Sequence, residues 1–465
     1  MAIHPIEFRY GSQEMKGVFE EGARLQRLLG VEAALARAQA RVGNIPKGEA
    51  EAIASKANTR AVRLERVKEL EREVEHDIMA VVLALSEASG KAGRYVHLGA
   101  TSYDIVDTAN ALQFKDALVI VLRDLHEIEG ILLGLAEKHK STVAVGRTHG
   151  QHAVPITYGL KFALWAREVR RQIERLEEGK KRVLVGKMSG AVGTMASFGT
   201  KGPAIQEAVM ADLGLRPAEV SNQVVPRDGY AELISLLALV AASMDKFARE
   251  VRNLMRTEIG EISEPFREER QVGSSTMPQK RNPINSEKVC GLARVVKSNV
   301  FVALENVSLE HERDLTNSSS ERVIIPETFI LLDEILKTMK KVLGGLVLYP
   351  ERIEANLGMT RGLNMAEAVM LALVEKGMGR QEAHELLRRL SLEASNKGIG
   401  LKDALLASKE VGRYMKREEI DAVLDPHRYI GTAVEQVERI VEMAKRERSS
   451  IKPGKKTGSK QGRGK

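Results

Sequence analysis

Three long stretches of this chain carry apolar residues at steps of three and four, the spacing of one face of an α-helix. They span residues 116–139, 230–259 and 329–342. The apolar positions are Leu118, Val121, Leu125, Ile128, Leu132 and Leu135, then Tyr230, Leu233, Leu237, Met244, Phe247, Val251, Leu254 and Ile259, then Phe329, Leu332, Ile335, Met339 and Val342. Helices of this length bury their stripes against other helices, so we expect an all-α fold built on a long helical bundle. The pattern also favours packing between subunits.

The length of the chain predicts more than one structural unit, because single cores rarely grow large enough for 465 residues. We expect an N-terminal helical domain at 1–104, a central long-helix domain at 105–357 and a C-terminal helical domain at 358–448. Residues 449–465 are rich in glycine and lysine and have no apolar periodicity. They are therefore predicted to be a disordered basic tail.

Composition narrows the class of protein. The only cysteine is Cys290, which excludes an internal disulfide framework. No signal peptide is apparent, and the longest apolar run, 233–244, is too short for a membrane span, so a soluble cytoplasmic protein is expected. Much of the formal net charge of +8 lies in the tail, which makes nucleic-acid binding a minor alternative.

Four polar stretches interrupt the helical pattern, at 73–81 with 94–110, at 145–161, at 272–287 and at 309–327. They contain the histidines His76, His97, His149, His152 and His311. No cysteine or carboxylate completes a zinc-ligand spacing, so no metal site is expected. Phosphate-binding loops, dinucleotide fingerprints and the nucleophile elbow of serine hydrolases are also missing from the sequence, so no cofactor is expected.

The segment VGSSTMPQKRNPI at 272–284 has the composition of a loop that serves chemistry. Gly273 frees the backbone, and Lys280 and Asn282 are donors for the negative charge that develops when a proton is removed beside a carboxylate. Ser274 is a plausible base only when such donors surround it. A histidine can protonate a departing amine near neutral pH. These features favour a lyase that needs no cofactor.

The motif GSSTMPQKRNP resembles the signature loop of the fumarase/aspartase superfamily, whose members eliminate fumarate from a succinyl-containing substrate. Four other stretches resemble the branch that acts on succinylated purine nucleotides: RYGSQEM at 9–15, HLGATSYDIVDTA at 97–109, GRTHGQHAVPITYGLK at 146–161 and HERDLTNSSSER at 311–322. The resemblance implies a carbon–nitrogen lyase of purine biosynthesis, without a cofactor. It also implies a homotetramer with the central bundle as its core and active sites shared by three subunits.

The resemblance assigns roles residue by residue. Ser274 corresponds to the base that removes the Cβ proton, and His149 to the acid that protonates the leaving nitrogen. The remaining catalytic positions implied are His76, Lys280 and Glu287, where Glu287 would support the histidine. The substrate-binding positions implied are Arg9, Tyr10, His97, Thr101, Ser102, Gln223, Asn282, Arg313, Ser318 and Arg322. Arg9, Tyr10, Arg313, Ser318 and Arg322 are the group expected to hold the nucleotide phosphate.

Alternatives stay open at this point. Thr276 and Gln279 depart from the usual loop, which leaves room for an argininosuccinate lyase or a carboxymuconate cycloisomerase. A non-catalytic protein on the same fold, like the lens crystallins, is a further alternative. His76 also fits a solvated helix, and Thr101 with Ser102 also fits a helix cap near Asp104.

Overall fold

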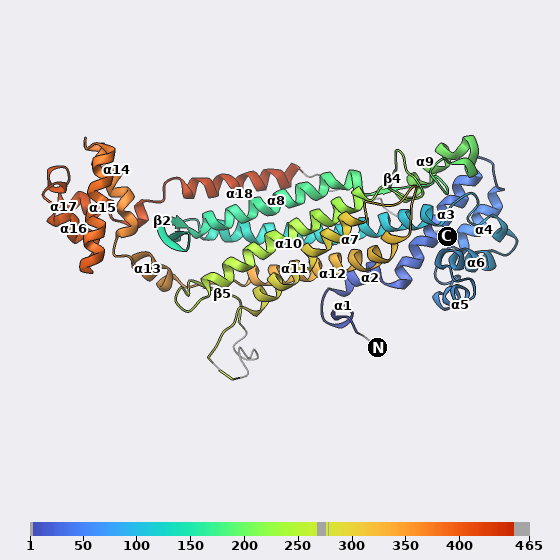
Figure 1. Ribbon diagram of the computed structural model, residues 1–465, viewed down its shortest axis with the longest axis horizontal. Coiled ribbons are helices and arrows are strands. Elements are labelled where there is room, and N and C mark those ends of the chain that lie inside the picture. The colour runs from blue at the N-terminus through green and yellow to red at the C-terminus, as the bar shows by residue number, and fades with distance from the viewer. Residues whose placement is uncertain (1–2, 267–275, 278, 451–465) are drawn as a thin grey trace, which may run out of the picture. The chain divides into compact units, whose positions relative to one another are not determined.

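The computed structural model describes residues 3–266, 276–277 and 279–450, and within them the chain is all-α, as the apolar stripes predict (Figure 1). Those residues form eighteen α-helices, some short 3₁₀ turns and three two-stranded sheets. They divide into two compact units, each assembled from separate chain segments. The larger unit comprises 1–128, 168–252 and 264–345, and the smaller comprises 129–167, 253–263 and 346–465. The boundaries predicted at 104 and 357 stay a prediction.

Three long helices contribute residues to both units. They are α7 (Ser102–Lys138), α8 (Tyr158–Val183) and α10 (Asp228–Leu254). The other helices of the larger unit are α1 (Pro5–Phe8), α2 (Gln13–Phe19), α3 (Glu21–Arg41), α4 (Lys47–Lys56), α5 (Leu64–Val74), α6 (Asp77–Ser89), α9 (Gly202–Leu213), α11 (Ile284–Glu305) and α12 (Thr316–Gly344). Its strands are β3 (Val185–Gly186) and β4 (Arg216–Pro217), which pair in parallel, and its 3₁₀ turns are Gly90–Tyr95 and Ala196–Lys201.

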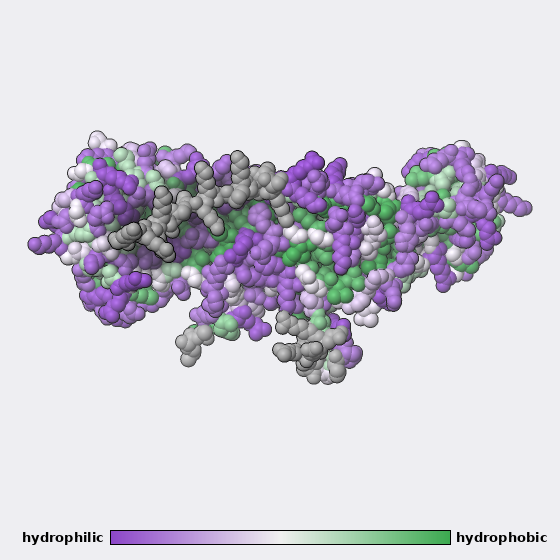
Figure 2. All heavy atoms as spheres, turned by 180° about the vertical axis from the view of Figure 1, so that it is seen from behind, coloured by the Kyte–Doolittle hydropathy of each residue, from purple (hydrophilic) through white to green (hydrophobic). Residues whose placement is uncertain are grey.

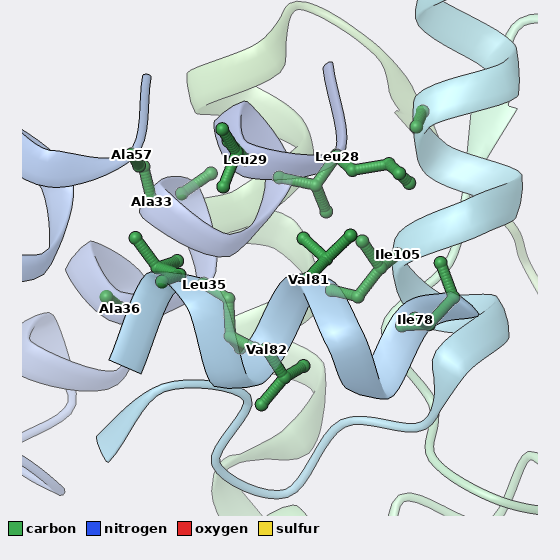
Figure 3. Close-up of a cluster of buried hydrophobic side chains, with 14 of the residues drawn as sticks. Leu28, Leu29, Ala33, Leu35, Ala36, Ala57, Ile78, Val81, Val82 and Ile105 are labelled. Carbon is green, nitrogen blue, oxygen red and sulfur yellow. The ribbon is translucent and has the colours of Figure 1, made fainter. Parts of the chain in front are cut away.

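The N-terminal helices of the larger unit pack around one apolar cluster (Figure 3). Leu28, Leu29 and Leu35 on α3 meet Val81 and Val82 on α6 in this cluster. Burying such side chains contributes about 1.5–3 kcal/mol each, before the entropy of ordering them is counted. The cluster holds α3 and α6 in position against each other.

The three apolar stripes are confirmed as the buried faces of α7, α10 and α12, with two exceptions at their ends. Leu135 is half-buried, and Ile259 lies beyond the end of α10 at Leu254. The chain turns there, and Gly260 has a φ of +62°. Aromatic rings lock the larger unit: the ring centroids of Phe114 and Phe329 are 6.2 Å apart, and those of Phe114 and Tyr230 are 5.1 Å apart.

The smaller unit contains an antiparallel hairpin and the C-terminal helices. The hairpin joins β1 (Val143–Thr148) to β2 (Gln151–Thr157), and β5 (Ile262–Ser263) pairs with β6 (Val347–Leu348). The helices are α13 (Pro350–Gly358), α14 (Ala366–Glu375), α15 (Arg380–Lys397), α16 (Leu401–Ala407), α17 (Arg417–Val423) and α18 (Ala433–Ser450), with 3₁₀ turns at Leu363–Met365, Val411–Arg413 and Pro426–Arg428. Helices α14 to α17 pack around their own apolar cluster.

No single helix in the described part of the chain combines the length and the apolar character of a membrane span. One bent pair of segments, Pro350–Gly358 with Leu363–Glu375, passes that test by length and composition alone.

Candidate active site

A cavity of about 110 Å³ in the larger unit collects two of the predicted substrate-binding residues. Ser318 and Arg322 on α12 lie in its wall, together with Arg24 from α3, Tyr103 from α7 and Phe19 from the end of α2. This arginine cavity therefore presents two guanidinium groups, the hydroxyl groups of Ser318 and Tyr103, and one carboxylate, that of Glu321. Arginine forks with a hydroxyl are well suited to bind phosphate or carboxylate oxygens.

Arg24 was not predicted as a site residue, yet its environment is that of a ligand-binding arginine. Its guanidinium makes no hydrogen bond or ion pair with any other residue that the structure describes. Burial lowers the pKa of Arg24, and the positive charge of Arg322 lowers it further, while the negative charge of Asp77 offsets part of this. A partly buried cation that makes no direct ion pair is costly, and an anion in the cavity would offset that cost.

His76 and Arg322 are connected through Asp77. The Nδ1 atom of His76 accepts a hydrogen bond of 3.3 Å from the backbone N–H of Met79, which makes His76 the N-cap of α6. Arg322 donates a hydrogen bond of 2.6 Å to Asp77. Burial alone would raise the pKa of Asp77, but the hydrogen bond and charge of Arg322, the backbone N–H of Ile78 and the charge of Arg24 together outweigh it and hold that pKa below its ordinary value. The exposed His76 is thus the neighbour in sequence of the carboxylate that pairs with Arg322 of the arginine cavity. Its side chain also caps the N-terminus of α6.

Arg313 and Gln223, far apart in sequence, contact each other directly. An Arg313 Nη atom donates to the side-chain oxygen of Gln223 over 3.0 Å. The Arg313 guanidinium also lies 3.8 Å from the centroid of the Tyr103 ring, close enough for a cation–π contact. Two of its nitrogens, Nε and one Nη, are buried without a partner among the described residues. Through Tyr103, this pair adjoins the arginine cavity.

A buried ion network fixes the loop that carries Gln223. Arg227 donates two hydrogen bonds of 2.9 Å to Asp107 on α7 and two, of 2.7 and 3.2 Å, to Glu321 on α12. Asp107 also accepts from the backbone N–H of Val225 over 2.8 Å. Because both carboxylates and the guanidinium are buried, the loss of one partner would leave an uncompensated charge.

Thr101 and Ser102 stand at the start of α7, where Asp104 organises the chain. The Asp104 carboxylate accepts hydrogen bonds from the backbone N–H groups of Thr101, at 2.8 Å, and Ser189, at 2.9 Å. It also pairs at 2.5 Å with the fully buried ammonium of Lys187. The helix begins at Ser102, and the Asp104 carboxylate binds the N–H of Thr101, so a capping role for the Thr101 and Ser102 hydroxyls stays a prediction.

His97 contacts the buried carboxylate of Glu32 through its ring and its backbone. Its Nδ1 atom lies 2.6 Å from Oε1 of Glu32, and its backbone N–H donates to Oε2 of the same residue over 3.2 Å. The Glu32 side chain is 1% exposed, and that of His97 is 18% exposed. Burial alone would lower the pKa of His97, but the hydrogen bond and charge of Glu32 and the charge of Asp104 raise it overall.

The signature loop is described only in part. Ser274, the predicted base, lies outside the described residues. Lys280 and Glu287 are exposed and Asn282 is half-buried, just before and within the first turn of α11. Glu264 accepts hydrogen bonds from the backbone N–H groups of Asn285, at 3.2 Å, and Ser286, at 2.6 Å. These bonds anchor the end of the loop to α11.

His149, the predicted acid, occupies the tip of the β1–β2 hairpin in the smaller unit. Thr148 pairs with Gln151, so the hairpin turn consists of His149 and Gly150 alone. Both have positive φ angles, +54° and +74°. Two-residue turns with positive φ at both positions match the twist of the strands they join. The turn exposes the imidazole to solvent.

Glu261 binds the hairpin through Arg147 on β1 and through Tyr158, which follows β2. The Glu261 carboxylate is 1% exposed and forms an ion pair with Arg147. It accepts hydrogen bonds from the Tyr158 hydroxyl, at 2.5 Å, and from the Asn356 amide, at 2.8 Å. Burial alone would raise the pKa of Glu261, but these donors outweigh it and hold the pKa below its ordinary value.

Arg9 and Tyr10 are not brought to the arginine cavity. The Arg9 guanidinium lies 5.9 Å from the centroid of the Tyr10 ring, and neither residue lines the cavity wall. The residues that the structure describes contain no group of three or more His, Cys, Asp or Glu side chains that could hold a metal ion.

Sequence reasoning missed Arg24, Glu32 and Glu261. Each lies outside the four polar stretches, on or next to a helix whose apolar pattern dominates its surroundings. The available signal for Glu32 was a lone carboxylate inside the alanine-rich run GVEAALARA, a composition typical of a buried helix.

Residues 7–297 match the family described as Lyase, and residues 362–440 match the family described as Adenylosuccinate lyase C-terminus. The adenylosuccinate lyase of Pyrococcus horikoshii is 61% identical over 442 residues, covering 95% of this chain and 98% of that protein. The adenylosuccinate lyase of Methanothermobacter thermautotrophicus is 52% identical over 95% of this chain and 99% of its own length.

Solved structures share the fold. A fumarate lyase from Mesorhizobium sp. BNC1 aligns with a TM-score of 0.86 and 35% identity, over 93% of this chain and 98% of its own. A 3-carboxy-cis,cis-muconate lactonizing enzyme from Pseudomonas putida aligns with a TM-score of 0.86 and 34% identity, over 95% of this chain and 99% of its own.

Proposed function

This chain belongs to the adenylosuccinate lyase family, and we propose on that premise that it cleaves adenylosuccinate into AMP and fumarate. It performs the same elimination on the succinylated aminoimidazole carboxamide ribotide of purine biosynthesis, which yields the carboxamide ribotide and fumarate. The observation that carries this function is the match, along nearly the whole chain, to enzymes of that name.

The elimination requires one base, one acid and stabilisation of a dianion. Ser274 removes the Cβ proton of the succinyl group, the C–N bond breaks, and His149 delivers a proton to the leaving nitrogen. Lys280 and Asn282 stabilise the negative charge that develops on the succinyl carboxylates. His76 is a second histidine of the active site, Glu287 supports the histidine, and neither step needs a cofactor.

Recognition of the nucleotide phosphate falls to the arginine cavity. Ser318 and Arg322 line it, and Arg313, with its two unpaired nitrogens, packs on the ring of Tyr103, which also lines it. The positions of these donors support a phosphate subsite in the larger unit. Thr101, Ser102, His97 and Gln223 complete the binding surface, and Arg9 and Tyr10 join it from another subunit.

Such a site requires an oligomer, and we assign a homotetramer. Apolar side chains are exposed on the long helices of the larger unit: Phe301 is 68% exposed, Val323 61% and Leu304 54%. Figure 2 shows hydrophobic surface gathered over the long helices on one face. Exposed apolar patches of this kind mark association surfaces. Three subunits then contribute residues to each active site, and the enzyme works in the cytoplasm.

The decisive experiment measures fumarate release by the purified full-length chain from adenylosuccinate, from the succinylated ribotide and from argininosuccinate. Consumption of carboxymuconate is assayed in parallel, because a lactonizing enzyme shares the fold. We expect turnover of the two purine substrates only. Turnover of argininosuccinate or carboxymuconate without adenylosuccinate cleavage would overturn the proposal, and a folded but inert tetramer would favour the crystallin-like alternative.

A further inference from the structure

The contact between His97 and Glu32 has the geometry of a device that sets the charge of an imidazole. One carboxylate oxygen faces Nδ1 at 2.6 Å, and the other accepts the backbone N–H of the same residue at 3.2 Å. The two bonds fix both the ring and the backbone of His97 against α3. They also leave Nε2 as the ring nitrogen that makes no hydrogen bond with another described residue.

Charge balance supports a protonated ring. Glu32 is fully buried in the interior of α3, and no lysine or arginine among the described residues forms an ion pair with it. A buried carboxylate is stable when a cation neutralises it, and His97 is the group in position to do so. Asp104, at the start of α7, adds a second negative charge near the ring.

The backbone of His97 is also held in an uncommon conformation. Its φ is +62°, in the left-handed region that non-glycine residues rarely adopt. Such conformations persist where neighbouring groups over-determine them, and they are concentrated at functional sites. The hydrogen bond from the His97 N–H to Glu32 is one such restraint. Another is the 2.8 Å hydrogen bond from the Gln39 amide to the carbonyl of Leu98.

We propose that Glu32 is a positioning residue that keeps His97 protonated, so that its Nε2–H donates a charge-assisted hydrogen bond to an anionic group of the substrate. This inference rests on the proposed function, because it concerns binding of a succinylated nucleotide. The anionic group is a carboxylate or a phosphate, since both accept from an imidazolium. Thr101, just before α7, and Ser102, its first residue, follow His97 closely in the chain and contribute hydroxyl groups.

The first test is Glu32→Gln, which keeps the shape of the side chain and removes its charge. We expect KM for adenylosuccinate to rise about tenfold at neutral pH while kcat changes less than about threefold, because a charge-assisted hydrogen bond to substrate is lost. The KM increase should also begin at a lower pH than in the wild type. Glu32 raises the pKa of His97, so removing the carboxylate lets the ring lose its proton earlier as pH rises.

Gln39→Met is the matched control. Gln39 lies on the same helix, is buried like Glu32 and holds the same loop, but its bond to the carbonyl of Leu98 is neutral. A purely structural role for Glu32 predicts the same KM and pH profile in both variants. Inhibition by fumarate and by AMP identifies the anion: weaker fumarate inhibition of Glu32→Gln indicates the carboxylate, and weaker AMP inhibition indicates the phosphate. Unchanged inhibition by both products would overturn the inference.

A thermal double-mutant cycle tests the pair without any enzyme assay. It combines Glu32→Gln with His97→Asn, which tolerates a positive φ, and follows the melting temperature from pH 6 to pH 8.5. We expect a non-additive effect that weakens as pH rises through the pKa of His97. His97→Asn should also reproduce the KM increase of Glu32→Gln. Additive changes in melting temperature, or a wild-type KM in His97→Asn, would refute the proposed coupling of Glu32 and His97. A wild-type protein that does not cleave adenylosuccinate would instead refute the proposed function, and the melting temperatures of the cycle could still be interpreted.

Discussion

Charged side chains inside this protein find their partners far away in the sequence. Arg227 pairs with Asp107 and Glu321, and Glu32 pairs with His97. The resemblance carried by the motif HERDLTNSSSER named Ser318 and Arg322 together, and both line one cavity. It could not reveal Arg24, because the neighbours of a helix residue are set by tertiary packing. Sequence reasoning therefore found the residues that motifs carry and missed those that only the fold brings to them.

Arg24 offers the first test at the scale of single residues. We expect Arg24→Ala to raise KM for adenylosuccinate about tenfold and to weaken AMP inhibition similarly, since a guanidinium donor to phosphate is removed. Steady-state kinetics and product inhibition measure both. Arg27→Ala, one turn further along α3, is the control, because Arg27 pairs with Asp116 outside the cavity. Unchanged AMP inhibition in Arg24→Ala would exclude Arg24 from the phosphate subsite.

Glu261 makes a prediction about stability and pH. Its pKa is depressed in the folded state, so its contribution is present above the ordinary glutamate pKa of about 4.3 and is lost as pH falls through the lower, folded value. We expect Glu261→Gln to destabilise the protein by about 1–3 kcal/mol at pH 7 and to flatten the acid limb of the stability curve. Thermal melts from pH 7 to pH 3 measure this. The exposed neighbour Glu258 supplies the control Glu258→Gln, and equal curves for both variants would contradict the assignment.

At the scale of elements, the apolar stripes predicted the long helices well. The β1–β2 hairpin was not predicted, although its sequence contained a signal. The residues VAV and VPIT flank a histidine–glycine pair, and a glycine at the second turn position permits the positive φ of a two-residue turn. The resemblance named His149, but only the structure reveals that a tight turn carries it. The prediction that the second helix continues to Ile259 was wrong. Helix α10 ends at Leu254, and the chain then turns before Glu261, which binds Asn356.

Gly193 tests how one loop positions another. Its φ is +88°, and a Cβ atom there would lie 1.9 Å from the carbonyl oxygen of Ser221, two residues before Gln223. We expect Gly193→Ala to displace the 221–223 segment and raise KM for adenylosuccinate several-fold, which steady-state kinetics would measure. Gly43→Ala has a comparable φ of +76° but meets nothing within 4 Å. It controls for backbone strain alone, and equal KM values in the two variants would contradict the clash.

At the scale of the whole molecule, association is the central question. Phe301 is exposed on α11, so Phe301→Asp should cost a single chain little stability while placing a charge in the proposed interface. We expect sedimentation to show species smaller than a tetramer and activity to fall with them. Leu392→Asp, on α15 of the smaller unit, is an exposed control of the same charge. A tetramer that survives Phe301→Asp would exclude this surface from the interface.

Shared active sites predict complementation. Ser274→Ala and His149→Ala should each lower turnover by about two to four powers of ten. When the two inactive proteins are mixed and allowed to exchange subunits, some sites combine an intact Ser274 with an intact His149 from different chains. We therefore expect partial recovery of fumarate release. Proven exchange without recovery would show that each site uses one chain.

The interleaving of the two units has a consequence for biosynthesis. The smaller unit is assembled from residues 129–167, 253–263 and 346–465, so its final segment leaves the ribosome after nearly everything else has been made. The hairpin that bears His149 emerges early, yet Asn356, which helps to hold Glu261 beneath it, arrives some two hundred residues later. During translation, β1 and β2 are therefore made long before the residues that complete the smaller unit. Truncated chains that lack residues 346–465 should therefore be substrates for chaperones and proteases rather than half-enzymes.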